Sequence, residues 1–264
     1  MSPAAPPNAA QPRLLDRFAD WRLGDAVRLC AWSLALFLVL ALLVRYGVLA
    51  ALDDRILLSV QARAPSWMHD LGRLVNLVGG FERQALLVVV LAAIAFAAQR
   101  YLSAAAFLLL LTTTMVEVIV KHFLFFPRAE VVELLRVHPS DLPQEFAAVL
   151  PTLDTAVFPS GHVARATFLC GLLLFLALRR LHSARPRLVV TLLILAAMLV
   201  TGVTRVVLDE HFPSDVVGGY LLGLAALAPA LWLLSLERRR LDARRAERPR
   251  AGTMPAGSDA GGRQ

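Results

Sequence analysis

Charged residues, cysteine and lysine are all scarce in this sequence. Only 18% of its 264 residues are charged and 58% are hydrophobic, a balance that excludes an ordinary soluble domain. Lysine occurs once, as Lys121, although Lys and Arg together number 27. The two cysteines, Cys30 and Cys170, fall inside apolar runs, so we expect them to pack in the protein and to form no disulfide. No CxxC pair or zinc-ligand spacing is present, so the sequence gives no sign of a structural zinc site.

Long apolar runs are abundant instead, and they account for the mean hydropathy of +0.63. The fold class that they predict is all-α: a polytopic membrane protein with six transmembrane helices in one bundle, over residues 29–236. The spans are expected at about residues 29–52, 85–98, 102–120, 163–178, 188–203 and 216–236. We do not interpret the first run as a cleaved signal peptide, because the basic segment before it is too long.

The segments outside these runs are expected to differ in character. Residues 1–28 form a cytoplasmic N-terminal segment that is partly disordered, since its start is rich in Pro and Ala. Residues 53–84 form an amphipathic connection between the first two spans. Residues 237–264 form a basic and disordered cytoplasmic tail.

The distribution of arginine predicts the orientation in the membrane. Residues 179–187 carry four Arg and no acid, and residues 237–250 carry seven Arg against three acids. The long loop at residues 121–161 instead carries five acids against three basic residues. Basic short loops stay in the cytoplasm, so both termini are predicted to lie there and the protein to reside in the inner (cytoplasmic) membrane. Anchoring on anionic lipid explains the net charge of +7 better than nucleic acid does, because aromatic residues are not interleaved with the basic ones.

A polar stretch at residues 204–215 lies between the fifth and sixth runs, where a span meets water. Arg205 offers a planar cation suited to bidentate binding of phosphate oxygens. His211 offers an imidazole that can act as a nucleophile or as an acid or base near neutral pH. Asp215 follows one helical turn later, close enough to hold the ring in one tautomer. Pro213 suits the first turn of a helix, whose N-terminal NH groups would point at an anion beside His211.

Two further polar stretches are predicted to emerge on the same outer face. Residues 121–128 begin with Lys121 and end with Arg128, and residues 159–162 read Pro-Ser-Gly-His. Taken one at a time, such residues are more simply explained as interfacial side chains or helix starts. Their convergence on one face with Arg205 and His211 favours a site for an anion.

Together the three stretches resemble the type 2 phosphatidic acid phosphatase (PAP2) superfamily, whose signature is K-x6-R-P, P-S-G-H and S-R-x5-H-x3-D. The resemblance covers about residues 121–215, and the six-span plan matches the membrane branch of the family. The sequence departs from the signature at two positions. Ala129 stands where the family has a proline, with Pro127 just before Arg128, and Thr204 stands where serine is usual.

The resemblance implies a role for each residue of the candidate site. His211 is the nucleophile that forms a phosphohistidine, Asp215 orients it, and His162 is the general acid and then the general base. The phosphate is bound by basic side chains and by donors at the start of the fourth span: Lys121, Arg128, Ser160, Gly161 and Arg205. The N-terminal ends of the fourth and sixth spans add to the binding of the anion. No metal and no cofactor is implied, because basic side chains take the place of magnesium.

The predicted function is that of a metal-independent lipid phosphatase that acts at the extracytoplasmic face. Its substrate is a lipid phosphomonoester or diphosphate, with undecaprenyl diphosphate, phosphatidic acid, phosphatidylglycerol phosphate and lipid A phosphate all open. The alternatives are a lipid phosphotransferase with the same site, a non-catalytic protein that binds or transports anions, a vanadate-dependent haloperoxidase, and a His/Asp metal site near His122 and His138. Glu117, inside the third run, is expected to face the bundle interior or a polar cavity and receives no role. No oligomeric state is assigned.

Overall fold

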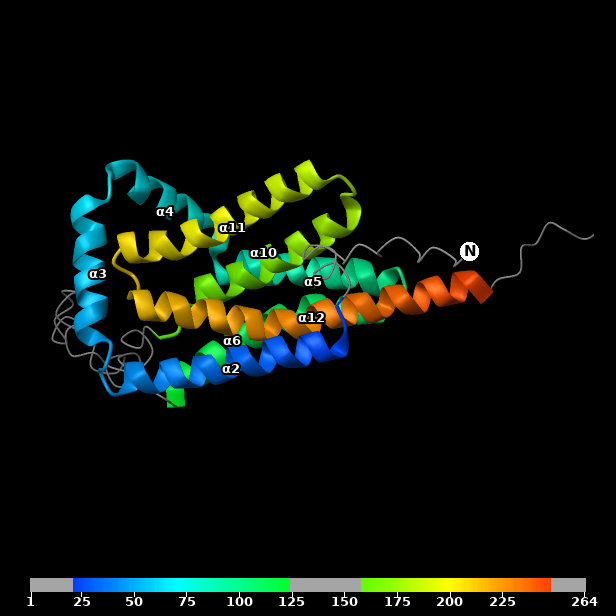
Figure 1. Cartoon of the computed structure of the whole chain (residues 1–264), viewed down its shortest axis with the longest axis horizontal. Coiled ribbons are helices and arrows are strands. Elements are labelled where there is room, and N and C mark those ends of the chain that lie inside the picture. The colour runs from blue at the N-terminus through cyan, green and yellow to red at the C-terminus, as the bar shows by residue number, and fades with distance from the viewer. Residues whose placement is uncertain (1–20, 124–157, 248–264) are drawn as a thin grey trace, which may run out of the picture.

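The computed structural model describes residues 21–123 and 158–247, and this part of the chain consists of helices without any strand (Figure 1). The helices are α2 Leu23–Arg45, α3 Ala50–Arg63, α4 Ser66–Gly79, α5 Phe81–Ala97, α6 Tyr101–Phe123, α10 Gly161–Arg180, α11 Ala184–Val207 and α12 Pro213–Glu247. The prediction of an all-α fold is confirmed.

Within the described residues, five helices are long and apolar enough to cross a membrane: α2, α6, α10, α11 and α12. A sixth span results if α4 and α5, which meet at a bend of 45°, are counted together. The second span was predicted to be short, and the structure agrees, because α5 alone has only 17 residues and needs α4 to complete a span. Side chains that face outward from the spans, such as Trp32, Leu193 and Met115, are apolar and exposed, as contact with lipid requires. The chain is therefore a multi-pass membrane protein.

The first span, Leu23–Arg45, begins and ends six to seven residues earlier than the predicted residues 29–52. Helix α2 begins earlier, at Leu23, where the carboxylate of Asp25 accepts a hydrogen bond from the backbone NH of Arg22 at 3.3 Å. It ends at Arg45. Gly47 then adopts a φ of +69°, which is incompatible with a right-handed helix and which glycine reaches easily because it has no Cβ atom. The predicted amphipathic connection at residues 53–84 contains two helices, α3 and α4, and the start of α5.

The last helix also extends further than predicted. Residues 237–247 belong to α12, although the sequence suggested a disordered tail from residue 237 onward. The carboxylate of Glu237 accepts hydrogen bonds from the NH of Leu102 at 3.1 Å and from Ser103 Oγ, so it caps the start of α6. An ion pair of 3.5 Å between Arg238 and Asp242 supports the following turn. Residues 1–20 and 248–264 lie outside the described part, and the disorder predicted for them stays a prediction.

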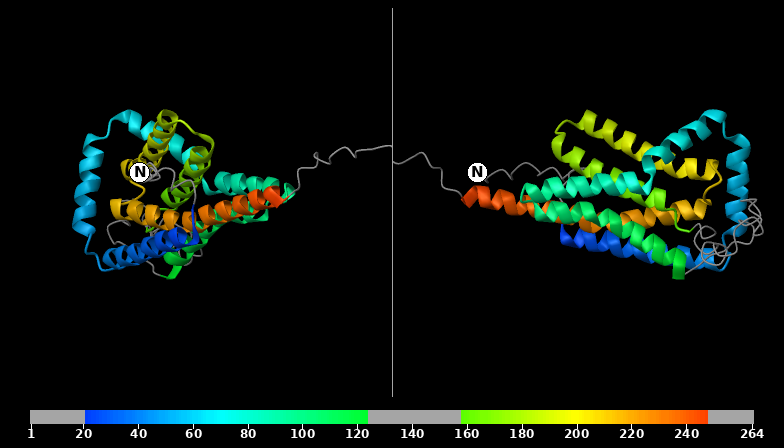
Figure 2. Two further views of the ribbon diagram at one scale, coloured as in Figure 1. Left: turned by 45° about the vertical axis from the view of Figure 1, so that its right-hand side comes forward. Right: turned by 180° about the vertical axis from the view of Figure 1, so that it is seen from behind.

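Helix α12 lies at the centre of the bundle and packs against α2, α6 and α10. Two glycines of α12 allow α10 to approach closely: a Cβ atom at Gly219 would lie 2.6 Å from Ser160 O, and one at Gly223 would lie 2.5 Å from Ala164 O. Helix α3 crosses one end of the bundle and α4 returns along α11, so these two helices cover that end (Figures 1 and 2). The covered end is where Lys121 and the second and third polar stretches lie.

Candidate active site

The candidate residues come from four elements that meet at this end of the bundle. Lys121 lies in the last turns of α6, Ser160 to His162 at the start of α10, Arg205 in the last turn of α11, and His211 in the turn before α12. The backbone NH of Ser160 donates a hydrogen bond of 3.0 Å to the carbonyl of Asp215, which ties the start of α10 to the first turn of α12.

Buried apolar neighbours hold the second and third polar stretches together. Val163, Val206 and Phe212 belong to one packed cluster, which also includes Leu57 of α3. They directly follow His162, Arg205 and His211 in the sequence, so packing of the cluster fixes the relative positions of the three polar residues. The predicted convergence of the second and third stretches is therefore present in the fold.

Lys121 is linked to the start of α10 by ion pairs through Glu117 and Arg165. The positive charges of Lys121 and Arg205 both act on the imidazole of His162, as does that of Arg165 in the next turn of α10. Lys121 Nζ also lies 2.9 Å from Glu117 Oε1, and Arg165 Nη1 lies 2.9 Å from Glu117 Oε2. This pair of contacts links α6 to α10 beside His162.

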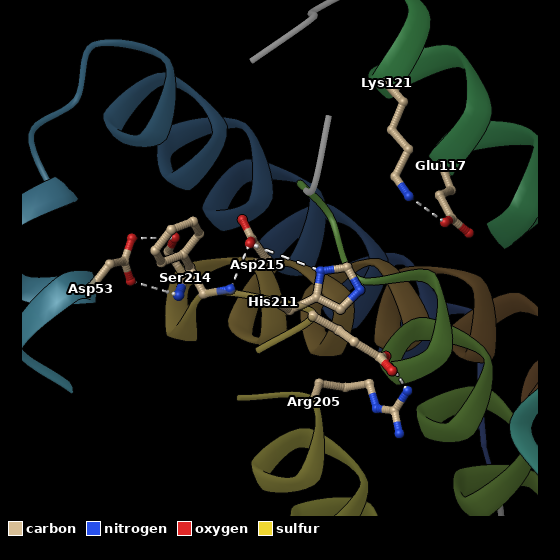
Figure 3. Close-up of polar contacts among 9 residues, drawn as sticks. Asp53, Glu117, Lys121, Arg205, His211, Ser214 and Asp215 are labelled. Carbon is tan, nitrogen blue, oxygen red and sulfur yellow. Dashed lines mark hydrogen bonds and ion pairs between the residues drawn. The ribbon is translucent and has the colours of Figure 1, made fainter. Parts of the chain in front are cut away.

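His211 and Asp215 lie next to each other, as their spacing predicted (Figure 3). The distance between His211 Nδ1 and Asp215 Oδ2 is 3.9 Å, which is close enough for an electrostatic interaction but exceeds a hydrogen bond. The same oxygen of Asp215 accepts a hydrogen bond of 2.8 Å from the NH of Phe212. Catalytic hydrogen bonds are often long before substrate binds, so this geometry fits a carboxylate that orients the ring.

Arg205 is fully buried and held by groups that the sequence did not reveal. Its Nη1 donates to Asn76 Oδ1 at 2.8 Å and to the carboxylate of Glu210, and its Nη2 donates to the carbonyl of Gly72 at 3.1 Å. Within residues 21–123 and 158–247, Nε of Arg205 and Oγ of Ser160 are buried without a hydrogen-bond partner. Buried donors of this kind are normally satisfied, so a bound anion is a suitable acceptor for them.

The start of α12 does not have free NH groups for an anion, contrary to the sequence-based expectation. The NH of Ser214 donates to Asp53 Oδ1 at 2.9 Å, and Ser214 Oγ donates to Asp53 Oδ2 at 2.7 Å. The NH of Phe212 is taken by Asp215, as described above. Two carboxylates therefore already cap this helix. Helix α10, by contrast, has Ser160 as its N-cap residue and no side-chain hydrogen bond at its cap.

Replacing Asp53 by alanine is expected to lower the stability of the protein and its activity together. Asp53 is 2% exposed, and loss of a helix cap costs about 0.5–2 kcal/mol. The first turn of α12 carries Asp215 and follows His211, so fraying there misplaces both residues. Thermal unfolding in detergent measures the effect. Asp54→Ala, which removes the adjacent and less buried carboxylate, is the control. Equal unfolding midpoints for the two variants would contradict the role of Asp53.

The structure thus brings together seven of the eight predicted site residues: Lys121, Ser160, Gly161, His162, Arg205, His211 and Asp215. Arg128 lies outside the described residues, as does His138, and their predicted roles stay predictions. Sequence reasoning missed Asp53 and Asn76, which act across the fold and have no local signal.

Comparison with known proteins places the chain among phosphatases. The sequence model of the PAP2 superfamily matches residues 101–239, more than half of the chain, and this range contains every candidate site residue. No curated protein gives a significant match. Among solved structures, the chain is similar to a transmembrane PAP2 type phosphatidylglycerolphosphate phosphatase from Bacillus subtilis, with a TM-score of 0.54 and 21% identity. The similarity covers 84% of this chain and 98% of that one, and it supports a shared fold.

Proposed function

This chain belongs to the PAP2 superfamily, and on that premise we propose that it is a metal-independent membrane lipid phosphatase. It cleaves a phosphomonoester or a diphosphate from a lipid by way of a phosphohistidine. The proposal rests chiefly on the grouping of Lys121, Arg205 and two histidines around one end of α10. Such a group can neutralise phosphate oxygens and also supply a nucleophile and a proton donor.

In the first step, Nε2 of His211 attacks the phosphorus atom. Asp215 lies on the Nδ1 side of the ring, so it stabilises the tautomer whose Nε2 lone pair is free. The bond from phosphorus to the leaving oxygen breaks as the bond to nitrogen forms. His162 gives its proton to that oxygen, and the dephosphorylated lipid leaves.

In the second step, His162 is neutral and removes a proton from a water molecule. The water attacks the phosphohistidine, the bond between phosphorus and nitrogen breaks, and inorganic phosphate is released while His211 returns to its starting form. Lys121 and Arg205, with Arg128, neutralise the equatorial oxygens as negative charge spreads over them in both transition states. Ser160 and the NH of Gly161 add hydrogen bonds to the same oxygens.

The membrane setting explains why the substrate is a lipid. The site lies at the end of the spanning helices, where a phosphate headgroup can reach it while the lipid tail stays in the bilayer. The arginine-rich turn after α10 and the arginine-rich end of α12 lie at the opposite end of the bundle (Figure 1). By the distribution of basic residues, that end is cytoplasmic, so the site faces the outside of the inner membrane.

This orientation predicts that a reporter fused after Gln264 is in the cytoplasm. A pair of fusions, one to alkaline phosphatase and one to a fluorescent protein that folds only in the cytoplasm, tests it directly. Fluorescence without alkaline phosphatase activity is the expected result. The reverse pattern contradicts the proposed orientation.

The proposed activity is tested by measuring phosphate release in detergent in the presence of EDTA. The substrates are undecaprenyl diphosphate, phosphatidic acid, phosphatidylglycerol phosphate and a lipid A phosphate. We expect the purified protein to release phosphate from at least one of them at an undiminished rate with EDTA. Failure with the whole panel would favour a protein that only binds or transports anions. Loss of the activity with EDTA would contradict metal independence.

A further inference from the structure

Glu117 of α6 lies inside the candidate phosphate site. Its carboxylate bridges two basic side chains, with Lys121 Nζ at 2.9 Å from one oxygen and Arg165 Nη1 at 2.9 Å from the other. It also lies directly against the start of α10, because a Cβ atom built on Gly161 would be 1.9 Å from Glu117 Oε2. A carboxylate of the protein therefore lies against Gly161, next to the groups with which the Pro-Ser-Gly-His stretch is expected to bind a phosphate oxygen.

Arg165 is a basic residue of the site that lies outside the three polar stretches of the sequence. It follows His162 by three residues, about one turn deeper in α10, and its side chain is 5% exposed. The guanidinium lies 5.7 Å from the ring centroid of Phe81, and within the described residues its Nε is buried without a hydrogen-bond partner. A buried arginine inside a span usually has a functional role.

The positive charges of Lys121 and Arg165 are only partly neutralised by Glu117, so an anion of higher charge can bind to them more strongly. Lys121 and Arg165 carry two positive charges between them and share the single negative charge of Glu117. A phosphate ester carries about −1.5 to −2 charges near pH 7 and offers three strong acceptor oxygens, whereas a carboxylate offers two. A phosphate is therefore the better ligand for the pair of cations and can displace the carboxylate from them.

We propose that Arg165 is a further phosphate-binding residue, and that Glu117 is an internal anion that holds the phosphate position when no substrate is bound. The proposal rests on the proposed function, because it assigns Lys121 to the phosphate. When substrate enters, its phosphate takes over the contacts to Lys121 and Arg165. After hydrolysis, Glu117 competes with inorganic phosphate for the same cations and so promotes release of the product.

A purely structural role for Glu117 makes the opposite prediction. If the carboxylate only neutralised buried Arg165, its removal would leave the guanidinium misplaced and would weaken phosphate binding. If it competes with phosphate, its removal strengthens phosphate binding, although the buried cations then lower the stability of the empty protein. The sign of the change in phosphate affinity therefore separates the two roles.

The test is the dissociation constant of inorganic phosphate for the full-length protein in detergent, measured from the phosphate-dependent rise in the unfolding midpoint. Glu117→Gln is expected to bind phosphate about tenfold more tightly than the wild type, which corresponds to one charge-assisted hydrogen bond. Arg165→Gln is expected to bind it about tenfold more weakly. A weaker or unchanged affinity in Glu117→Gln, or an unchanged affinity in Arg165→Gln, overturns the proposal.

Two further variants serve as a control for the loss of a buried carboxylate and as a substitute if Glu117→Gln does not fold. Glu237→Gln removes another buried carboxylate, which caps α6 away from the site, and is expected to lower the unfolding midpoint without changing phosphate affinity. If Glu117→Gln does not fold, the double variant Glu117→Gln/Arg165→Gln removes both buried charges. It is expected to bind phosphate more tightly than Arg165→Gln alone, and equal affinity of these two variants contradicts competition at Lys121.

Failure of this inference is distinguishable from failure of the proposed function. If the wild type hydrolyses a lipid phosphate but the variants bind phosphate like the wild type, only the roles of Glu117 and Arg165 are wrong. If the wild type neither hydrolyses any substrate of the panel nor binds inorganic phosphate, the proposed phosphate site itself is wrong.

Discussion

Replacement of His211 by alanine is expected to reduce phosphate release from the preferred lipid by at least about a thousandfold. Without the imidazole there is no nucleophile, and only the charges that stabilise the transition state remain. The initial rate of phosphate release in detergent, with EDTA present, is the measurement. The side chain is 11% exposed and lies in a turn before α12, so its removal leaves the apolar core of the bundle intact.

A matched control is His182→Ala, which removes an exposed histidine from the turn between α10 and α11 at the opposite end of the bundle. This variant is expected to keep the wild-type rate. The unfolding midpoints of both variants should lie close to that of the wild type. A His211→Ala protein that is folded and retains more than about a tenth of the activity would exclude His211 as the nucleophile.

Replacement of His162 by glutamine is expected to slow hydrolysis of the lipid by about 10²–10⁴-fold, the usual contribution of a general acid or base. The loss should depend on the leaving group. A lipid alkoxide needs a proton to leave, whereas a nitrophenolate does not. With an aryl phosphate, the first turnover in His162→Gln should therefore stay within about tenfold of the wild type. The following turnovers should be slow, because the same residue activates water in the second step.

Stopped-flow measurement of nitrophenolate release separates these phases. The expected trace for His162→Gln is a burst of about one equivalent per active protein, followed by a slow steady state. An equal loss of rate for the lipid and for the aryl ester in the first turnover would contradict a role for His162 as the acid. It would point instead to a role in placing the phosphate.

Much of the fold follows from properties that are local in the sequence. Length and hydropathy predict the spans from α6 onward well, because an apolar helix must satisfy its backbone groups internally in lipid. The break after α2 was missed, since Gly47 lies among apolar residues that are compatible with a longer helix. The helical end of α12 was missed because its basic composition favoured a disordered tail, whereas Glu237 contacts the start of α6 and an ion pair joins Arg238 to Asp242 in the next turn.

In the candidate site, too, local features could be predicted from the sequence and tertiary contacts could not. The spacing of residues 204–215 predicted the adjacency of His211 and Asp215, which depends on a single helical turn. The cap supplied by Asp53 could not be predicted, because this residue is 161 positions from Ser214 and lies in a helix that the sequence presented as a connection. The sequence predicts that a helix start has NH groups available for an anion, but only the fold shows whether a distant carboxylate already accepts their hydrogen bonds.

The positions of Glu117 and Arg165 could be predicted only in part from the sequence. A carboxylate inside an apolar run was a visible signal, and the structure places it among basic side chains, as such residues generally require. Arg165 gave an equal signal, since it interrupts an apolar run one turn after His162, but only the fold shows that both charges meet beside Gly161.

The proposed mechanism requires that His211 becomes phosphorylated during turnover. It is tested most directly by mixing the His162→Gln protein with an aryl phosphate labelled in the phosphoryl group, quenching under alkaline conditions and locating the label by peptide mass spectrometry. We expect the label on His211, where it is stable in base and lost in acid, and we expect it to accumulate to near one equivalent. A protein that turns over substrate without labelling His211, or that carries the label on another residue, would contradict the mechanism.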